Sequence, residues 1–164
     1  MVNIRNATEQ DAKSLAYIQT ESWKSAFRGI LSEGDLVKHT ELDKTEAMYG
    51  QVLQNPNIRV LLETVSGKPH CMAAWGPNRA VLGVQTAELI CIHSLPDKWR
   101  QGYGSMMMDR ILADMREAGF SEVMLWVFEQ NQRARKFYEK HGFSLTERTQ
   151  NGFGAVELMY SRKL

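Results

Sequence analysis

Apolar residues along this chain follow two different periods, and the first third of the chain follows the helical one. Apolar positions recur every three or four residues from Ala12 to Ala26, and Thr8 with Asp11 has the pattern of a capping box at the start of that segment. Gly29 and Gly34 interrupt the pattern. In chain order, we expect a strand at 3–6 and then a helix that starts after Thr8 and ends at Ala26. A short helix should follow from Asp35, and a further helix, capped by Asp43, should end near Leu53.

Strand-like runs dominate the rest of the chain. Short stretches rich in aliphatic and aromatic residues are separated by Gly, Pro, Asn or Ser, and Gly119 marks the end of one helical stretch. We expect strands at 58–65, 70–75, 87–95, 122–128, 143–148 and 153–162, and helices at 106–118 and 131–141. A strand, a crossover helix and a strand predict one parallel pair, whereas hairpins predict antiparallel pairs. The expected fold class is therefore α/β, with a mixed, mostly antiparallel sheet, helices on both faces, and a single domain over residues 1–164.

Composition and charge are those of an ordinary globular domain. The 164 residues are 43% hydrophobic and 24% charged. A net charge of +1, from 20 basic and 19 acidic residues, gives no indication of a nucleic-acid or membrane surface. Without a run of about 18 apolar residues or a signal-peptide core, we expect a cytoplasmic protein. Cys71 and Cys91 lie in strand-like runs without metal-ligand spacing to any histidine, so we expect free thiols and no metal.

The segment from Pro96 to Ser105 joins a strand-like run to a helical run through a glycine-rich turn. Such a junction forms an anion site, because free N–H groups at the helix start point at the ligand and the helix dipole favours negative charge. Two familiar phosphate loops do not fit. A P-loop needs Lys-Ser or Lys-Thr after its last glycine, but Ser105 follows Gly104, and a dinucleotide fingerprint needs Gly or Ala where Met107 stands. The segment is either a site for another phosphorylated ligand or a turn that simply starts a helix.

A second motif downstream favours the ligand site. Its positions read Asn131, Ala134, Phe137, Tyr138, Gly142 and Phe143. With Gly102 and Gly104 upstream, this motif resembles the GNAT superfamily of acetyl-CoA-dependent N-acetyltransferases. The resemblance spans nearly the whole chain and implies a GNAT-like fold with acetyl-CoA as co-substrate. The chain departs from the family at Trp99, where Gln or Arg is usual, although Arg100 and Gln101 stand beside it.

The resemblance also implies a set of cofactor contacts. Backbone N–H groups of the loop would hold the pyrophosphate beside Arg100, and the end of the preceding strand would pair with the pantetheine arm. Asn131 would hydrogen-bond that arm or cap its helix. The implied cofactor-binding residues are Ile92, His93, Ser94, Arg100, Gln101, Gly102, Tyr103, Gly104, Ser105, Asn131 and Arg135. In contrast, Arg133, Lys136 and Lys140 have the pattern of a solvated face.

The resemblance places the general acid at Tyr138. A phenol with a pKa near ~10 is protonated at neutral pH and can give its proton to a departing thiolate. An aromatic packing residue is the alternative for this position. Glu88 is our candidate general base, with an exposed strand-end glutamate as its alternative and His93 as a second candidate.

The acceptor pocket of such folds is built from the first helices and the first hairpin, which carry Trp23, Phe27, Tyr49 and Trp75. Aromatic rings can bind an amine through cation–π contacts or can be part of the core. We expect an N-acetyltransferase that moves an acetyl group from acetyl-CoA to a primary amine of a small molecule or peptide, by direct attack in a ternary complex. A non-catalytic acyl-CoA-binding module and a transferase for another acyl group stay open. The closing strands offer an edge for a homodimer.

Overall fold

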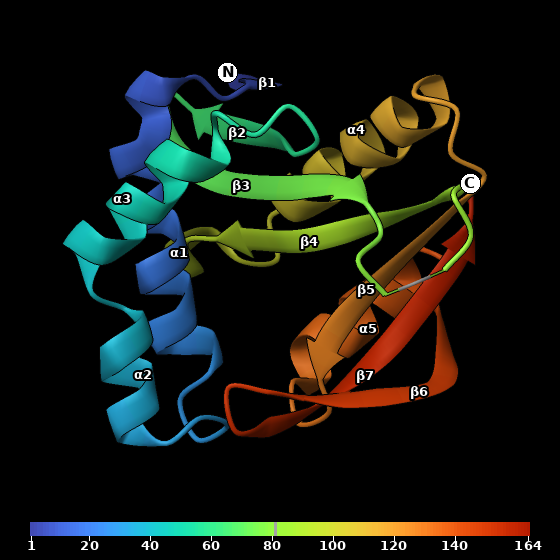
Figure 1. Cartoon of the computed structure of the whole chain (residues 1–164). Helices are drawn as coiled ribbons and strands as arrows, with labels where there is room; N and C mark the ends of the chain where they lie inside the picture. The colour runs from blue at the N-terminus through green and yellow to red at the C-terminus, as the bar shows by residue number, and fades with distance from the viewer. Residues whose placement is uncertain (81) are drawn as a thin grey trace.

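The computed structural model describes residues 1–80 and 82–164, which form one seven-stranded sheet flanked by helices (Figure 1). In chain order the elements are β1 (Val2–Asn6), η1 (Glu9–Asp11), α1 (Ala12–Ala26), α2 (Glu33–His39), α3 (Leu42–Val52), β2 (Arg59–Val65), β3 (Lys68–Pro77), β4 (Thr86–Ser94), η2 (Pro96–Lys98), α4 (Tyr103–Glu117), β5 (Glu122–Phe128), α5 (Gln132–Lys140), β6 (Ser144–Gly152) and β7 (Ala155–Lys163). Every helix and strand expected from the sequence is present, with some ends shifted.

The strands follow the order β1-β2-β3-β4-β5-β7-β6, and β4 with β5 is the parallel pair. The other neighbours pair antiparallel. The parallel pair arises because α4 crosses over between β4 and β5, as a parallel connection requires. This topology confirms the expected mixed α/β sheet.

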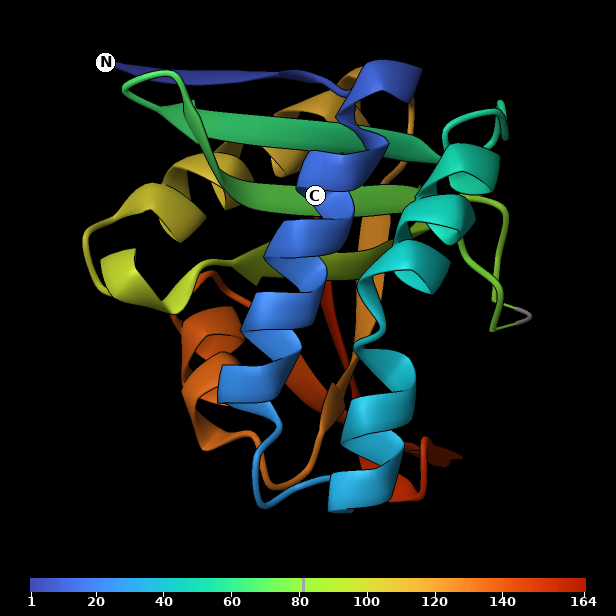
Figure 2. The same ribbon diagram turned by 90° about the vertical axis from the view of Figure 1, so that its left-hand side faces the viewer.

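Helices cover both faces of the sheet. In Figure 2, α1, α2 and α3 lie in front of the strands, α4 lies behind them, and α5 lies to their lower left. Tyr138 of α5 packs in the same core as Met107 of α4, so both helices cover the same face. Because side chains alternate along a strand, neighbouring residues of β2 belong to different cores. Leu61 packs in the core of α4, which includes Met107, whereas Leu62 packs with Leu15 and Ile18 of α1. The sheet is therefore buried on both sides.

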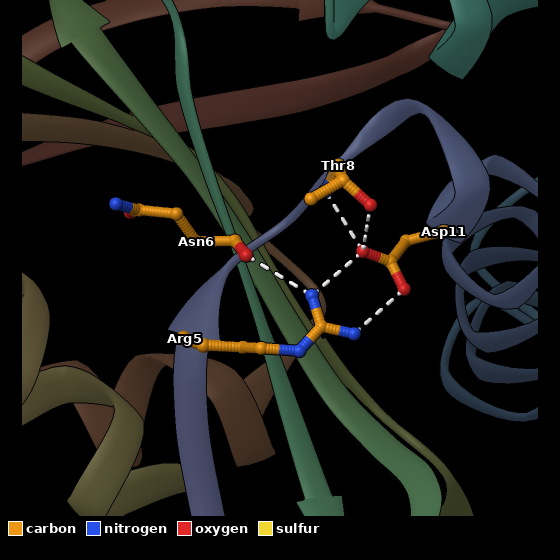
Figure 3. A network of polar contacts seen from close by, with 4 residues as sticks. All are labelled: Arg5, Asn6, Thr8 and Asp11. Atoms are coloured by element: carbon orange, nitrogen blue, oxygen red, sulfur yellow. Dashed lines mark hydrogen bonds and ion pairs between the residues drawn. The ribbon is translucent and has the colours of Figure 1, made fainter.

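The start of the first long helix is fixed by an ion pair as well as by the expected capping box. The Asp11 carboxylate accepts hydrogen bonds from the Thr8 N–H at 2.7 Å and from the Thr8 hydroxyl at 3.1 Å. Two nitrogens of Arg5 donate to the same carboxylate at 2.7 and 2.8 Å (Figure 3). These hydrogen bonds, chiefly those from Arg5, lower the pKa of Asp11 to about 2. The network ties β1 to the helical turn that follows it.

Two helix ends test the expected termini. Gly119 follows the last residues of α4 with φ of +91°, so its predicted place just beyond the helix is confirmed. The expected cap at Asp43 is wrong, because α3 already begins at Leu42 and Glu41 is its N-cap residue. Glutamate is not among the preferred N-cap residues, and the Glu41 side chain makes no capping hydrogen bond. The sequence therefore carries no cap pattern at this start.

The parallel pair separates soon after it begins. Residues Thr86–Glu88 of β4 pair with Glu122–Met124 of β5, and the register stops there. The register of β4 against β3 also shifts between Ala74 and Trp75, which marks a β-bulge. In Figure 1, β4 and β5 start close together and then diverge. The wedge between them is where the candidate site lies.

Within residues 1–80 and 82–164, no helix combines the length and the apolar character needed to cross a membrane. The same residues contain no group of three or more His, Cys, Asp or Glu side chains placed to hold a metal ion.

Candidate active site

Two adjoining cavities occupy the region where β4 and β5 diverge. The first is lined by Ser22, Trp23, Ala26, Phe27, Leu89, Ile90, Cys91, Ile92, His93, Ser94, Gly104, Trp126, Val127, Phe128, Asn131, Arg133, Ala134, Phe137, Tyr138, Phe153 and Glu157. The second is lined by His70, Ser94, Lys98, Trp99, Arg100, Gly102, Tyr103, Gly104, Ser105, Gln132, Arg133, Lys136, Phe137 and Lys140. Ser94, Gly104, Arg133 and Phe137 line both, so the two cavities adjoin. We call them the catalytic cavity and the anion cleft.

The anion cleft forms at the first turn of α4. Gly102 has φ of +92°, a left-handed conformation that favours glycine, and it turns the chain into the helix. The first α-helical hydrogen bond closes from the Met106 N–H to the Gly102 carbonyl at 3.1 Å. The N–H groups of Tyr103, Gly104 and Ser105 precede that bond and have no carbonyl of their own helix to meet. They can therefore hold a phosphate, as the glycine loop predicts.

Cations surround this helix start. Arg100 lines the cleft as expected, together with Lys98 from η2. Three more come from α5, namely Arg133, Lys136 and Lys140. All three are exposed, as expected for a solvated face, and their spacing of three and four residues also puts them on the side of α5 that borders the cleft. A cleft with five cationic side chains matches a ligand with several phosphate charges.

Arg135 lies apart from that cluster. Its Nε donates to the Tyr160 hydroxyl at 3.0 Å, and its Nη1 donates to the Glu129 carbonyl at 3.0 Å. Arg135 lines neither cavity, because it projects from another side of α5 than Arg133 and Lys136. Gln101 is exposed and also lies outside both linings, whereas Arg100 and the residues from Gly102 to Ser105 border the cleft.

Trp99, the departure from the family motif, has a defined place. Its indole N–H donates to the Ser94 carbonyl at 3.0 Å, which ties the loop to the end of β4. The guanidinium carbon of Arg133 lies 3.7 Å from the centroid of the Trp99 ring. This cation–π stack joins the loop to α5 near the place where the two cavities adjoin. A stacked Trp–Arg pair thus stands where the family carries a single Gln or Arg side chain.

Tyr138 and Asn131 both reach the catalytic cavity. Tyr138 on α5 is 8% exposed, and burial raises the pKa of its hydroxyl, so the phenol holds its proton at neutral pH. Asn131 accepts a hydrogen bond from the Ala134 N–H at 3.2 Å through Oδ1. That bond confirms the capping alternative for Asn131, and the residue also lines the catalytic cavity.

The end of β4 supplies Ile92, His93 and Ser94 to the wall of the catalytic cavity. His93 Nε2 accepts from the indole N–H of Trp23 at 3.3 Å, which places the ring proton on Nδ1. Burial and, to a smaller extent, the charge of Arg133 lower the pKa of His93 to about 4. His93 is therefore neutral at pH 7, and Trp23 already occupies one of its nitrogens.

Glu88 is engaged elsewhere. Its carboxylate accepts from the Arg79 N–H and Nε, each at 3.0 Å, and from Arg79 Nη2 at 2.7 Å. Glu88 is 2% exposed and does not line either cavity, because it lies in the paired part of β4, before the strands diverge. The carboxylate of the expected base is therefore bound to the guanidinium of Arg79 and lines neither cavity.

The aromatic acceptor candidates divide between the cavity and the core. Trp23 and Phe27, from the last turn of α1 and its C-cap, line the catalytic cavity and lie 5.0 Å apart between ring centroids. Trp75 is 2% exposed in the core of α4 and packs against Phe120 at 6.2 Å, away from both cavities. Trp75 is therefore a core residue, because the alternation of β3 turns its side chain toward α4.

Sequence reasoning missed the part of the acceptor wall that comes from β5 and from the β6–β7 hairpin. Phe128 lies 4.9 Å from Phe27, and Phe153 lies 5.2 Å from Trp23. Glu157 of β7 completes this wall. No local motif marks these three residues, and only the pairing of β5 with β7 brings them to the end of α1.

Comparison with known proteins agrees with this geometry. The sequence model described as the acetyltransferase (GNAT) family matches residues 20–143. A probable N-acetyltransferase of Mycobacterium tuberculosis is 26% identical over 150 residues, covering 90% of this chain and 83% of its own. A spermidine N(1)-acetyltransferase of Thermoplasma acidophilum is 22% identical over 154 residues, covering 89% and 90% respectively.

Solved structures show the same fold. The PaiA N-acetyltransferase of Thermoplasma acidophilum, crystallised in complex with coenzyme A, superposes with a TM-score of 0.85 at 20% identity and covers 100% of this chain and 99% of its own. A putative acetyltransferase of Salmonella typhimurium, crystallised with acetyl-CoA, superposes with a TM-score of 0.74 at 19% identity, covering 99% and 93%. The family match spans well over half of the chain, and the fold agrees over its full length. This protein is an acyltransferase that belongs to the acetyltransferase (GNAT) family.

Proposed function

We propose that this protein transfers an acetyl group from acetyl-CoA to a primary amine by direct attack in a ternary complex. The observation that carries the proposal is the junction of the two cavities. A cleft with five cations and a free helix N-terminus opens into a cavity that holds a protonated phenol and a wall of aromatic rings. A phosphorylated thioester and an organic amine can therefore meet without a covalent enzyme intermediate.

The residues of the anion cleft fit acetyl-CoA. The first N–H groups of α4 would hold the pyrophosphate, and Arg100, Lys136 and Lys140 would neutralise its charge. The free edge of β4 beyond Glu88, where pairing with β5 has ended, would bond the pantetheine arm. Acetyl-CoA supplies the activated thioester, and the amide of Asn131 would fix the arm that carries it.

Tyr138 is the residue that we propose as general acid. Tyr138 lines the catalytic cavity with its hydroxyl protonated and would donate that proton to the sulfur as the carbon–sulfur bond breaks. Glu88 has no role in this mechanism, because Arg79 holds its carboxylate. The amine nitrogen forms the new bond to the carbonyl carbon, and water in the open cavity takes the proton that this nitrogen loses.

An amine acceptor follows from the wall of the catalytic cavity. Trp23 and Phe27 offer apolar and cation–π surface to an alkylamine, and Glu157 offers negative charge. The Thermoplasma acidophilum relative named a spermidine N(1)-acetyltransferase supports an amine of this kind.

Thermal unfolding with acetyl-CoA tests the cofactor, and CoA release with amines tests the reaction. At about 100 times its Kd, acetyl-CoA should stabilise the fold by about 2.7 kcal/mol and raise Tm by about 5–11 °C, whereas NAD should not. No shift with acetyl-CoA would overturn the cofactor assignment. A shift without CoA release from any amine would favour a non-catalytic acyl-CoA-binding module, and release with succinyl-CoA or propionyl-CoA alone would replace the acetyl group.

A further inference from the structure

Glu157 stands at the acceptor end of the catalytic cavity. It is the register partner of Phe128 across the β5–β7 pair, and cross-strand partners project from the same face of a sheet. On that face the Phe128 ring meets Phe27 edge-on at 4.9 Å. The carboxylate of Glu157 therefore belongs to the same wall as the aromatic rings.

Two residues of β6, Gly152 and Gln150, lie next to the carboxylate of Glu157. A Cβ on Gly152 would lie 2.5 Å from Glu157 Oε2, so any larger residue there would displace the side chain. Gln150 Nε2 donates to the same oxygen at 2.7 Å and fixes its orientation. The charge of Glu157 is felt by Arg79, but the guanidinium of Arg79 is bound to Glu88, and Glu157 forms no ion pair of its own among the described residues.

Aromatic rings border the position that a cation beside Glu157 would take. Phe153 of the hairpin is 48% exposed and lies 5.2 Å from Trp23, with the ring planes 82° apart. The face of an aromatic ring carries partial negative charge and can attract a cation. The cation of the cavity, Arg133, is instead stacked on Trp99 at the side of the anion cleft. The two ends of the cavity therefore have opposite charge.

We propose that Glu157 binds a second ammonium group of the acceptor, so that the preferred substrate class is the aliphatic di- or polyamines. One amine of such a molecule lies at the thioester near Ile92 and Tyr138, while the other lies between Glu157 and the rings of Phe128 and Phe153. The inference rests on the proposed function and adds to it a residue that selects the acceptor. An amine that carries a carboxylate at its far end would meet the charge of Glu157 and bind poorly.

Three acceptors of matched length test this assignment, namely cadaverine, pentylamine and δ-aminovalerate. With the wild-type protein, kcat/KM for cadaverine should exceed that for pentylamine by about tenfold or more, as expected for one charge-assisted contact. δ-Aminovalerate should be the poorest of the three. Glu157→Gln should bring the cadaverine value down to that of pentylamine, chiefly by raising KM for cadaverine. It should leave the acetyl-CoA-dependent rise in Tm unchanged.

Two further variants make the result unambiguous. Glu147→Gln removes the same charge from an exposed position of β6 outside the cavity, and it should keep the preference for cadaverine. Glu157→Lys should move the preference toward δ-aminovalerate, an outcome that loss of packing cannot produce. Equal values for cadaverine and pentylamine in the wild type, or a preference that survives Glu157→Gln, would overturn the inference. Absence of turnover with pentylamine as well would instead count against the proposed function.

Discussion

Replacing Glu63 with glutamine is expected to stabilise this protein above pH 7. Glu63 lies in β2, is 0% exposed, and pairs in register with Ile4 on one side and Cys71 on the other. Neither of its carboxylate oxygens has a hydrogen-bond partner in the described part of the chain. A buried carboxylate without partners is costly in its charged form, and burial accordingly raises the pKa of Glu63 to about 7 from an ordinary value of 4.5.

The size of the effect follows from that pKa. A rise from 4.5 to about 7 is worth about 3 kcal/mol, at 1.36 kcal/mol for each pKa unit. Because the folded state holds the proton more tightly, the native state binds more protons than the unfolded chain between these two pH values. The stability of the wild-type protein therefore falls as pH rises from about 4.5 to about 7, and the loss is complete above that. Glutamine keeps the shape of the side chain without the charge and avoids this loss.

Urea unfolding at pH 5 and pH 8 measures the effect. At pH 8, Glu63→Gln should raise the free energy of unfolding by about 3 kcal/mol, or Tm by about 6–12 °C, whereas at pH 5 the gain should be small. Glu147→Gln, at an exposed position of β6, is the matched control and should change little at either pH. A Glu63→Gln protein no more stable than wild type at pH 8 would refute the reasoning, as would a gain of equal size at both pH values.

Two further predictions concern the general acid and the start of the first helix. Tyr138→Phe should lower kcat about a hundredfold with little change in KM for acetyl-CoA, because it removes a proton donor and leaves the ring in place. Steady-state kinetics measure both constants. An unchanged kcat would remove Tyr138 from the mechanism. Asp11→Asn should cost about 2 kcal/mol at pH 7, because the pKa of Asp11 is lowered from 3.8 to about 2 and its contribution is present above the higher value. Unfolding from pH 7 down to pH 2 should show that cost disappearing as pH falls through the lower value, and a cost independent of pH would contradict the ion-pair account.

Local patterns predicted the elements well, because each depends on a period that a short segment carries by itself. The strand expected at 122–128 is β5 with the same ends, and the helix expected at 131–141 is α5 at Gln132–Lys140. The start of α4 was placed late, at residue 106, because Tyr103, Gly104 and Ser105 carry no apolar period. In the structure, these residues are helical and supply the free N–H groups of the anion cleft.

The cofactor half of the site was also within reach of the sequence, because its residues are close together along the chain. The loop from Arg100 to Ser105 and the helix that carries Tyr138 are each a contiguous motif. Arg135 and Lys136 show the limit of such reasoning. They are adjacent in sequence but project in different directions, and only the packing of α5 against the loop decides which one lines the anion cleft.

The acceptor half depended on the tertiary structure. Glu88 begins a strand and has the motif of a base, yet the fold brings the guanidinium of Arg79 to within 2.7 Å of it. Glu157 has no motif, yet the pairing of β7 with β5 sets it opposite Phe128 in the acceptor wall.

The sequence by itself determined the order and type of the elements and the glycine turn before α4, because periodicity, glycine turns and helix starts are local properties of the chain. The direction of each side chain, its charged partners and the shape of the acceptor cavity arise from contacts between residues distant in sequence. Those contacts exist only once the sheet has formed and its central strands have separated, and so the tertiary structure alone decided them.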